Sequence, residues 1–105
     1  MGVGIYWTVF SRKQLRDIFY YYRDNASFPV AQKLISGIVQ ETKKLGEGYE
    51  IGQREELLIE RNKDFRYLVF RNYKIVYRYN PEKERIDIAD VFDTRQNPVK
   101  ITRKK

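Results

Sequence analysis

Three cations around one predicted β-hairpin are the residues of this sequence that could act together on a ligand. Lys74 and Arg78 lie four residues apart in a run of aromatic and branched side chains, and Arg95 follows the next such run. Residues an even number apart along a strand point to the same face of a sheet, so we expect Lys74 and Arg78 to share a face. Arg95, at the end of the neighbouring strand, is expected to fold back over that face. The three cations together would favour an anionic partner.

The composition excludes several kinds of chemistry. The 105 residues include no cysteine and no histidine, so we expect no metal site, disulfide, thiol nucleophile or histidine base, and no cofactor. Lys and Arg number 21 against 14 Asp and Glu, and the net charge of +7 favours nucleic acid or an acidic protein as partner. A basic domain without such a partner is the alternative. No apolar run is long enough to span a membrane and the N-terminus lacks a signal-peptide layout, so we expect no membrane contact and a cytoplasmic protein.

The hairpin belongs to a predicted three-stranded meander over residues 65–70, 73–79 and 85–92, all rich in β-prone side chains. Arg71 and Asn72 form a two-residue turn, in which Asn tolerates a positive φ. Phe70 then pairs with Tyr73, and alternation gives the two faces. One face carries Arg66, Leu68, Phe70, Tyr73, Ile75, Tyr77 and Tyr79, and the other carries Phe65, Tyr67, Val69, Lys74, Val76 and Arg78.

Before the meander, the pattern predicts a strand over residues 3–10, with Ile5, Trp7 and Val9 on one face, and then a helix. Ser11 is the expected N-cap, with Gln14 three residues later as in a capping box. The helix ends at residues 23–25. Its apolar stripe leaves out Tyr20 and Tyr21, which either pack at the edge of the stripe or contact a partner.

A second helix follows a short turn. Ser27 is the expected N-cap, Pro29 is tolerated in the first turn, and Gly46 is the expected stop signal. Two helices joined so closely should form an antiparallel hairpin whose apolar stripes pack on the sheet. Residues 47–54 are predicted as a loop and residues 55–61 as a further strand.

The predicted order is therefore β-α-α-β-β-β-β within a single domain, residues 1–105, with residues 99–105 as a frayed basic tail. The fold class is α+β, with the helical hairpin on one face of a mostly antiparallel twisted sheet. The first strand is expected at a sheet edge, and the face away from the helices is expected to be open and to carry the function.

In this order and spacing the sequence resembles the RelE/ParE superfamily, the toxins of type II toxin-antitoxin modules, often described as plasmid stabilisation proteins. The resemblance lies in FRYLVFRNYKIVYRY, residues 65–79, and VFDTRQNP, residues 91–98. It implies a growth-inhibiting toxin and a cognate antitoxin that is acidic and folds on the toxin. It also makes a homodimer or a toxin-antitoxin heterotetramer possible.

The superfamily has two branches with different activities. RelE-type members cut messenger RNA on the ribosome, which requires a base, an acid and cations around the attacked phosphate. The RelE cation positions fall here on Phe65, Tyr67, Lys74 and Arg95, and its C-terminal tyrosine falls near Ile101. Only Lys74 and Arg95 remain as candidate catalytic residues, so the resemblance favours the ParE branch, whose members poison DNA gyrase without an enzymatic step. A ribosome-dependent endoribonuclease and a degenerate, inactive binding module are the alternatives.

On the ParE-like interpretation, the residues expected to bind the target are Arg66, Tyr67, Lys74, Arg78 and Arg95, and those expected to bind the antitoxin are Tyr20 and Tyr21. The alternative for the arginines is structural. Arg66, Arg78 and Arg95 could each form an ion pair with Asp87, Asp90 or Asp93.

Overall fold

The structure of the protein, a computed structural model, describes residues 4–48, 52–54 and 65–95. Its elements are β1 (Gly4–Trp7), α1 (Val9–Asn25), α2 (Phe28–Thr42), the 3-10 helix η1 (Lys43–Glu47), β2 (Gln53–Arg54), β3 (Phe65–Phe70), β4 (Tyr73–Asn80) and β5 (Arg85–Asp93). The strands form one sheet in the order β1-β5-β4-β3-β2. The edge strand β1 runs parallel to β5 and the other neighbours are antiparallel. The predicted α+β fold and the edge position of the first strand are confirmed.

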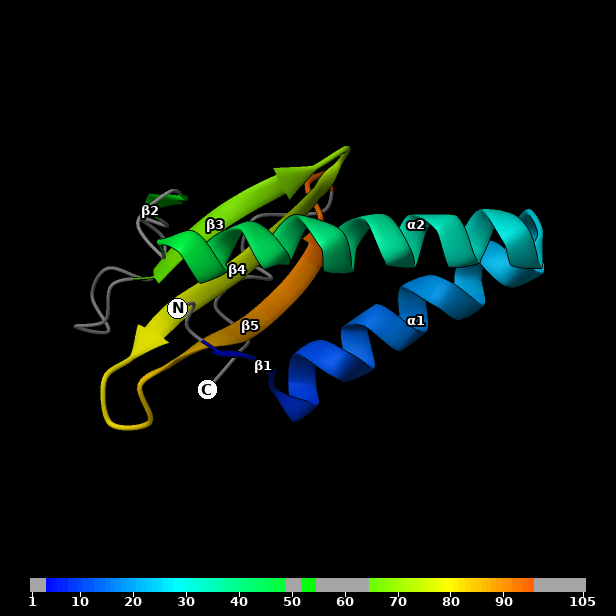
Figure 1. Cartoon of the computed structure of the whole chain (residues 1–105). Coiled ribbons are helices and arrows are strands. Elements are labelled where there is room, and N and C mark those ends of the chain that lie inside the picture. Colours follow the sequence, from blue (N-terminus) through cyan, green and yellow to red (C-terminus); the bar gives the residue numbers. More distant parts are fainter. Residues whose placement is uncertain (1–3, 49–51, 55–64, 96–105) are drawn as a thin grey trace.

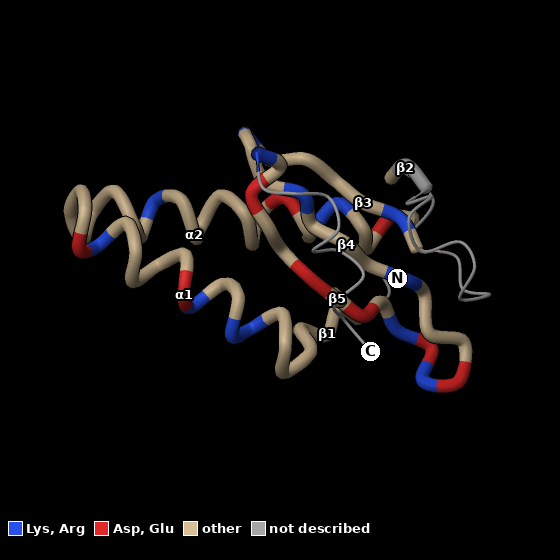
Figure 2. The backbone as a smooth tube through the Cα atoms, turned by 180° about the vertical axis from the view of Figure 1, so that it is seen from behind, with Lys and Arg blue, Asp and Glu red and all other residues tan. Residues whose placement is uncertain are grey.

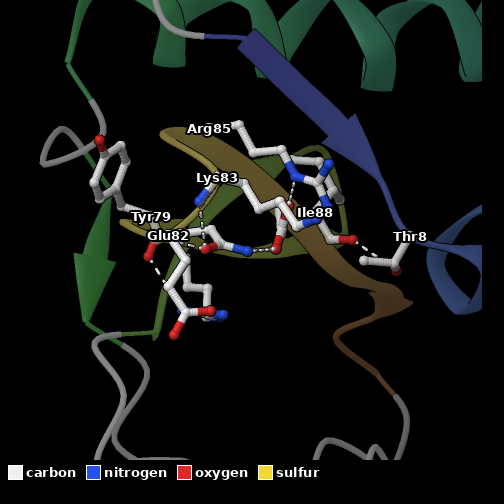
Figure 3. A network of polar contacts seen from close by, with 9 residues as sticks. Thr8, Tyr79, Glu82, Lys83, Arg85 and Ile88 are labelled. Atoms are coloured by element: carbon white, nitrogen blue, oxygen red, sulfur yellow. Dashed lines mark hydrogen bonds and ion pairs between the residues drawn. The ribbon is translucent and has the colours of Figure 1, made fainter.

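The first helix begins three residues earlier than the sequence pattern predicts. Thr8, which has an extended backbone, is its N-cap, and its hydroxyl accepts a hydrogen bond from the Ser11 amide at 3.1 Å. The same hydroxyl donates to the Ile88 carbonyl of β5 at 2.9 Å, so one side chain joins α1 to the sheet (Figure 3). The predicted cap at Ser11 is therefore wrong, and Val9 belongs to the helix and is 71% exposed.

The second helix begins as predicted. The Ser27 hydroxyl accepts from the Val30 amide at 3.2 Å, and a proline stands in the first turn. At the other end the prediction is wrong, because α2 ends at Thr42 and the chain continues through Gly46 as the 3-10 helix η1. The helices lie side by side on one face of the sheet, and the turn between them projects beyond it (Figure 1). We call this sheet face the helix face.

The β3–β4 hairpin has the predicted register, with Phe70 opposite Tyr73 and Phe65 opposite Arg78. Within this turn the positive φ, 56°, belongs to Arg71, so the prediction that gave it to Asn72 is wrong. The turn between β4 and β5 is closed by a side chain. The Asn80 carboxamide oxygen accepts from the backbone amides of residues 82 and 83, each at 3.1 Å (Figure 3).

A β-bulge in β5 changes which side chains face the helices. Tyr77 of β4 lies opposite Ile88, but its neighbour Val76 lies opposite Asp90, so Ala89 is an extra residue. An extra residue reverses the alternation beyond it. Ile88 packs in the helix-side core, and so does Val91, although the two are three residues apart.

The sheet has apolar clusters on both faces. Among the described residues, those buried in the core under the helices are Leu34, Ile38, Leu45, Leu68, Tyr73, Ile75, Tyr77, Ile86, Ile88 and Val91. On the other face, which we call the second face, Val76, Ala89 and Phe92 are buried, with Phe65 and Tyr67 packed against them. The expectation of an open face is therefore wrong at the centre of this face, where Val76 is fully buried and Phe92 only 6% exposed, although Val69 nearby is 50% exposed.

The edge strand β2 lies in a segment that the sequence pattern predicts as a loop. Gln53 and Arg54 pair with Tyr67 and Arg66 of β3. Just before them the Gly52 amide donates to the buried Tyr77 hydroxyl at 2.9 Å, and the site has no room for a side chain at residue 52. The predicted strand over residues 55–61 and the predicted tail over 99–105 lie outside the described residues.

Candidate functional site

Two of the predicted target-binding cations share the second face of the sheet. Lys74 and Arg78 of β4 lie opposite Val69 and Phe65 of β3, as the alternation predicts. The Lys74 ammonium nitrogen lies 4.0 Å from the centroid of the Tyr67 ring, a cation–π contact. The Arg78 guanidinium donates to the Tyr79 carbonyl at 3.2 Å. Tyr67, Lys74 and Arg78 thus form one cationic and aromatic group.

Arg95 does not join this group. Its guanidinium binds the Asp93 carboxylate, with the shortest contact at 2.6 Å, beside Tyr22 and Tyr73 on the helix face. The bulge in β5 is the reason, because it reverses the alternation and sends the Asp93 side chain toward α1. The predicted convergence of Lys74, Arg78 and Arg95 is wrong, whereas the structural alternative for Arg95, an ion pair with Asp93, is confirmed.

The other predicted arginine, Arg66, lies near the sheet edge. One of its terminal nitrogens donates to the Gly52 carbonyl at 3.2 Å, so it fastens the segment before β2 to β3. The candidate acidic partner Asp87 binds Arg85 at 2.7 Å and accepts from the Asn80 side chain at 3.0 Å (Figure 3). Asp87 therefore pairs with neither Arg66 nor Arg78.

A pocket of about 430 Å³ lies between α1 and the end of β5, and sequence reasoning did not find it. Its lining residues are Gln14, Asp17, Ile18, Tyr21, Tyr22, Tyr73, Val91, Phe92, Asp93 and Arg95. The Tyr73 hydroxyl donates to the Tyr22 hydroxyl at 3.3 Å. The residues come from segments more than 50 positions apart, and only the bulge brings Asp93 among them, so no local pattern could have indicated the pocket.

The electrostatics of the pocket follow from these contacts. Burial raises the pKa of Tyr73 above its ordinary value, and the hydrogen bond to Tyr22 raises it further. The hydrogen bond from Arg95 holds the pKa of Asp93 well below its usual range, although burial opposes this. At neutral pH the pocket therefore contains a neutral Tyr73 and a charged Asp93–Arg95 pair.

The predicted antitoxin-binding tyrosines lie on the projecting part of the helical hairpin. Tyr20 is 43% exposed and Tyr21 is 60% exposed. Phe19 contacts the rings of Tyr20 and Phe28 edge to face, each with centroids 5.7 Å apart. Phe28, itself 52% exposed, enlarges this aromatic surface beyond the sequence prediction.

The described residues show no concentrated charge cluster, metal site or membrane-spanning helix. Lys, Arg, Asp and Glu are spread over the helices, strands and turns of the described chain (Figure 2). Within residues 4–48, 52–54 and 65–95, no group of three or more acidic residues is arranged to hold a metal ion. None of the helices described there is long and apolar enough to cross a membrane.

Comparisons with known proteins give the family. A search of curated proteins finds no match. Among solved structures, the chromosomal ParDE toxin-antitoxin system from P. aeruginosa contains a chain with the same fold, with a TM-score of 0.71 and 19% identity. The match covers 87% of this chain and 95% of that one. The profile of the ParE toxin of type II toxin-antitoxin systems, parDE, matches residues 5–98, and the chain therefore belongs to the ParE toxin family.

Proposed function

We propose that this type II toxin inhibits growth by binding DNA gyrase and that it does not cleave RNA. Gyrase is proposed from the match to the ParE toxin family. The observation that argues against RNA cleavage is the separation of the two candidate catalytic cations. Lys74 lies on the second face of the sheet beside Tyr67, and Arg95 lies on the helix face in an ion pair with Asp93. Cations on opposite faces of a sheet cannot act on one phosphate.

The surroundings of Lys74 also favour binding over catalysis. Cleavage of RNA by its own 2′-hydroxyl needs an acid, a base and cations held together at the reacting phosphate. Around Lys74 the described second face is mostly apolar, with the cluster of Val76, Ala89 and Phe92 and the Phe65 and Tyr67 rings packed on it. The carboxylate described there, Asp90, lies opposite Val76 and is only 2% exposed. Aromatic and arginine side chains are the residues that contribute most to protein–protein interfaces.

The target-binding surface that we propose consists of Tyr67, Lys74 and Arg78 on the second face. Arg66, also predicted to bind the target, lies opposite Tyr77 on the helix face and binds the Gly52 carbonyl, so it is not part of this surface. Arg95, also predicted to bind the target, lies on the helix face as well, so its role would be separate. Tyr20 and Tyr21 are proposed for the antitoxin. An acidic antitoxin segment would suit the net charge of +7 and could bury the aromatic surface of the hairpin.

Induced expression in bacteria tests the proposal. The expected result is arrested growth, loss of negative supercoiling in a reporter plasmid, and rescue by the protein encoded in the adjacent open reading frame. Sequencing of messenger 5′ ends should show no new cleavage sites. Ribosome-dependent cleavage that disappears in a Lys74→Gln variant would instead support the RelE-like ribonuclease. Unaltered growth with a folded protein would indicate a degenerate toxin.

A further inference from the structure

The pocket between α1 and β5 is not explained by the proposed gyrase-binding surface, which lies on the other face of the sheet. Its walls are Ile18 and Tyr21 of α1 and Val91 of β5, and its polar groups are Tyr22 and the Asp93–Arg95 pair. Tyr21 and Tyr22 meet edge to face, with centroids 5.1 Å apart and an interplanar angle of 84°. The pocket therefore has walls of aliphatic and aromatic side chains and a polar end.

The polar end offers hydrogen-bond donors more than acceptors. The Tyr22 oxygen already accepts from the Tyr73 hydroxyl, so the proton of Tyr22 remains available to an occupant. Arg95 uses Nε and one terminal nitrogen on Asp93, at 2.6–3.2 Å. Arg95 also hydrogen-bonds Tyr22. A guanidinium has five N–H groups, so donors still remain, and the Arg95 side chain is 71% exposed.

The acidic groups at the pocket are already neutralised by neighbours. Asp93 accepts from the Arg95 guanidinium and also from the Arg95 backbone amide at 2.8 Å. Asp17 binds Lys13 at 3.1 Å on the exposed side of α1. With both carboxylates satisfied, the groups left for an occupant are the donors of Tyr22 and Arg95, which suit an oxygen acceptor.

We infer that this pocket binds a carboxylate side chain of an acidic segment of the antitoxin, through the Tyr22 hydroxyl and the Arg95 guanidinium. The inference rests on the proposed acidic antitoxin. A peptide fits better than a nucleic acid for two reasons. A nucleic acid would place a regular row of phosphates close to Asp17 and Asp93, whereas a peptide can place one carboxylate at the polar end and direct its other charges away from the pocket. The walls of Ile18, Tyr21 and Val91 also suit the apolar side chains next to an acidic residue.

Binding of purified toxin to the protein encoded in the adjacent open reading frame, followed by calorimetry, tests this inference. Tyr22→Phe removes the donor but keeps the ring, and Arg95→Lys keeps the charge but loses the planar fork. We expect each to weaken binding about tenfold or more, because a hydrogen bond to a charged group is lost. Arg12→Gln is the control, since it removes a cation from the exposed face of α1 outside the pocket. It should change the affinity less than threefold.

The outcomes separate this inference from the proposed function. If the wild-type toxin does not bind the neighbouring protein at all, the proposed antitoxin is wrong. If the wild type binds and both pocket variants bind equally well, the pocket is not the contact and this inference is overturned. The same holds if the pocket variants weaken binding to a short DNA duplex, in fluorescence anisotropy, and not to the protein. Unchanged melting temperatures of Tyr22→Phe and Arg95→Lys exclude a folding defect as the cause of weaker binding.

Discussion

At the start of α1, replacement of Thr8 by Ala should destabilise the fold more than replacement of Ser11 by Ala. The Thr8 hydroxyl accepts from the Ser11 amide at 3.1 Å and donates to the Ile88 carbonyl at 2.9 Å. Loss of an N-cap costs about 0.5–2 kcal/mol and loss of the second hydrogen bond about 0.5–1.5 kcal/mol. The Ile88 carbonyl keeps the Thr8 amide at 3.3 Å, so it is not left unsatisfied. The expected loss is therefore about 1–3.5 kcal/mol.

Ser11→Ala is the matched control, because Ser11 is the residue that the sequence pattern predicts as the cap. Its hydroxyl donates to the Thr8 carbonyl at 2.9 Å, and that carbonyl also accepts from the Arg12 amide at 2.9 Å. The carbonyl therefore keeps a partner in the variant, and Ala is the better helix former. The expected loss for Ser11→Ala is below about 1 kcal/mol.

Urea and thermal unfolding followed by circular dichroism measure both variants. At about 4 °C per kcal/mol, Thr8→Ala should melt about 4–14 °C below the wild type. Thr8→Ser keeps the hydroxyl and should remain close to the wild type. A loss for Ser11→Ala equal to or greater than that for Thr8→Ala would refute the reasoning and return the helix start to residue 11.

Three further predictions concern the sheet and its two faces. Tyr77→Phe should cost about 1–3 kcal/mol in urea unfolding, because the Gly52 amide loses its buried acceptor, and an unchanged midpoint would contradict this. The pKa of Asp93 is lower in the folded protein than in the unfolded chain. Ionised Asp93 therefore adds to the unfolding free energy at pH values above its ordinary pKa near 3.9, and this stabilisation is lost as the pH falls below that value. In the Asp93→Asn variant the unfolding free energy should therefore depend less on pH below about pH 4 than in the wild type. Parallel pH curves for the variant and the wild type would refute a stabilising role of the ion pair. Lys74→Gln should change the unfolding free energy by no more than about 1 kcal/mol, which is the size of a surface cation–π contact. The same variant should inhibit growth less than the wild type. Full toxicity in this variant would show that Lys74 is not part of the target-binding surface.

The hairpin and the second helix were predictable from the sequence because their signals are local. Alternation along residues 65–79, with one possible two-residue turn, determines the register of β3 and β4. Ser27 followed by proline marks the start of α2 for the same reason. Two caps of similar chemistry, Thr8 and Ser11, compete at the start of α1. The choice depends on the hydrogen bond from Thr8 to Ile88, which lies 80 residues away.

The candidate site was less predictable because a single extra residue controls it. Plain alternation from Ile86 and Ile88 would place residues 91, 93 and 95 on the second face, beside Lys74. The bulge at Ala89 reverses this, and Arg95 joins Asp93 on the helix face instead. The residues at the bulge include no glycine, so nothing in the local sequence marks it.

A supercoiling assay with purified DNA gyrase tests the central claim most directly. Relaxed plasmid, gyrase and ATP are mixed with increasing toxin, and in parallel with toxin preincubated with the protein from the adjacent open reading frame. A binding toxin is predicted to inhibit supercoiling in proportion to its concentration, the Lys74→Gln variant to inhibit less, and the preincubated sample not to inhibit. Full supercoiling activity at a toxin excess that still cleaves messenger RNA on purified ribosomes would contradict the account.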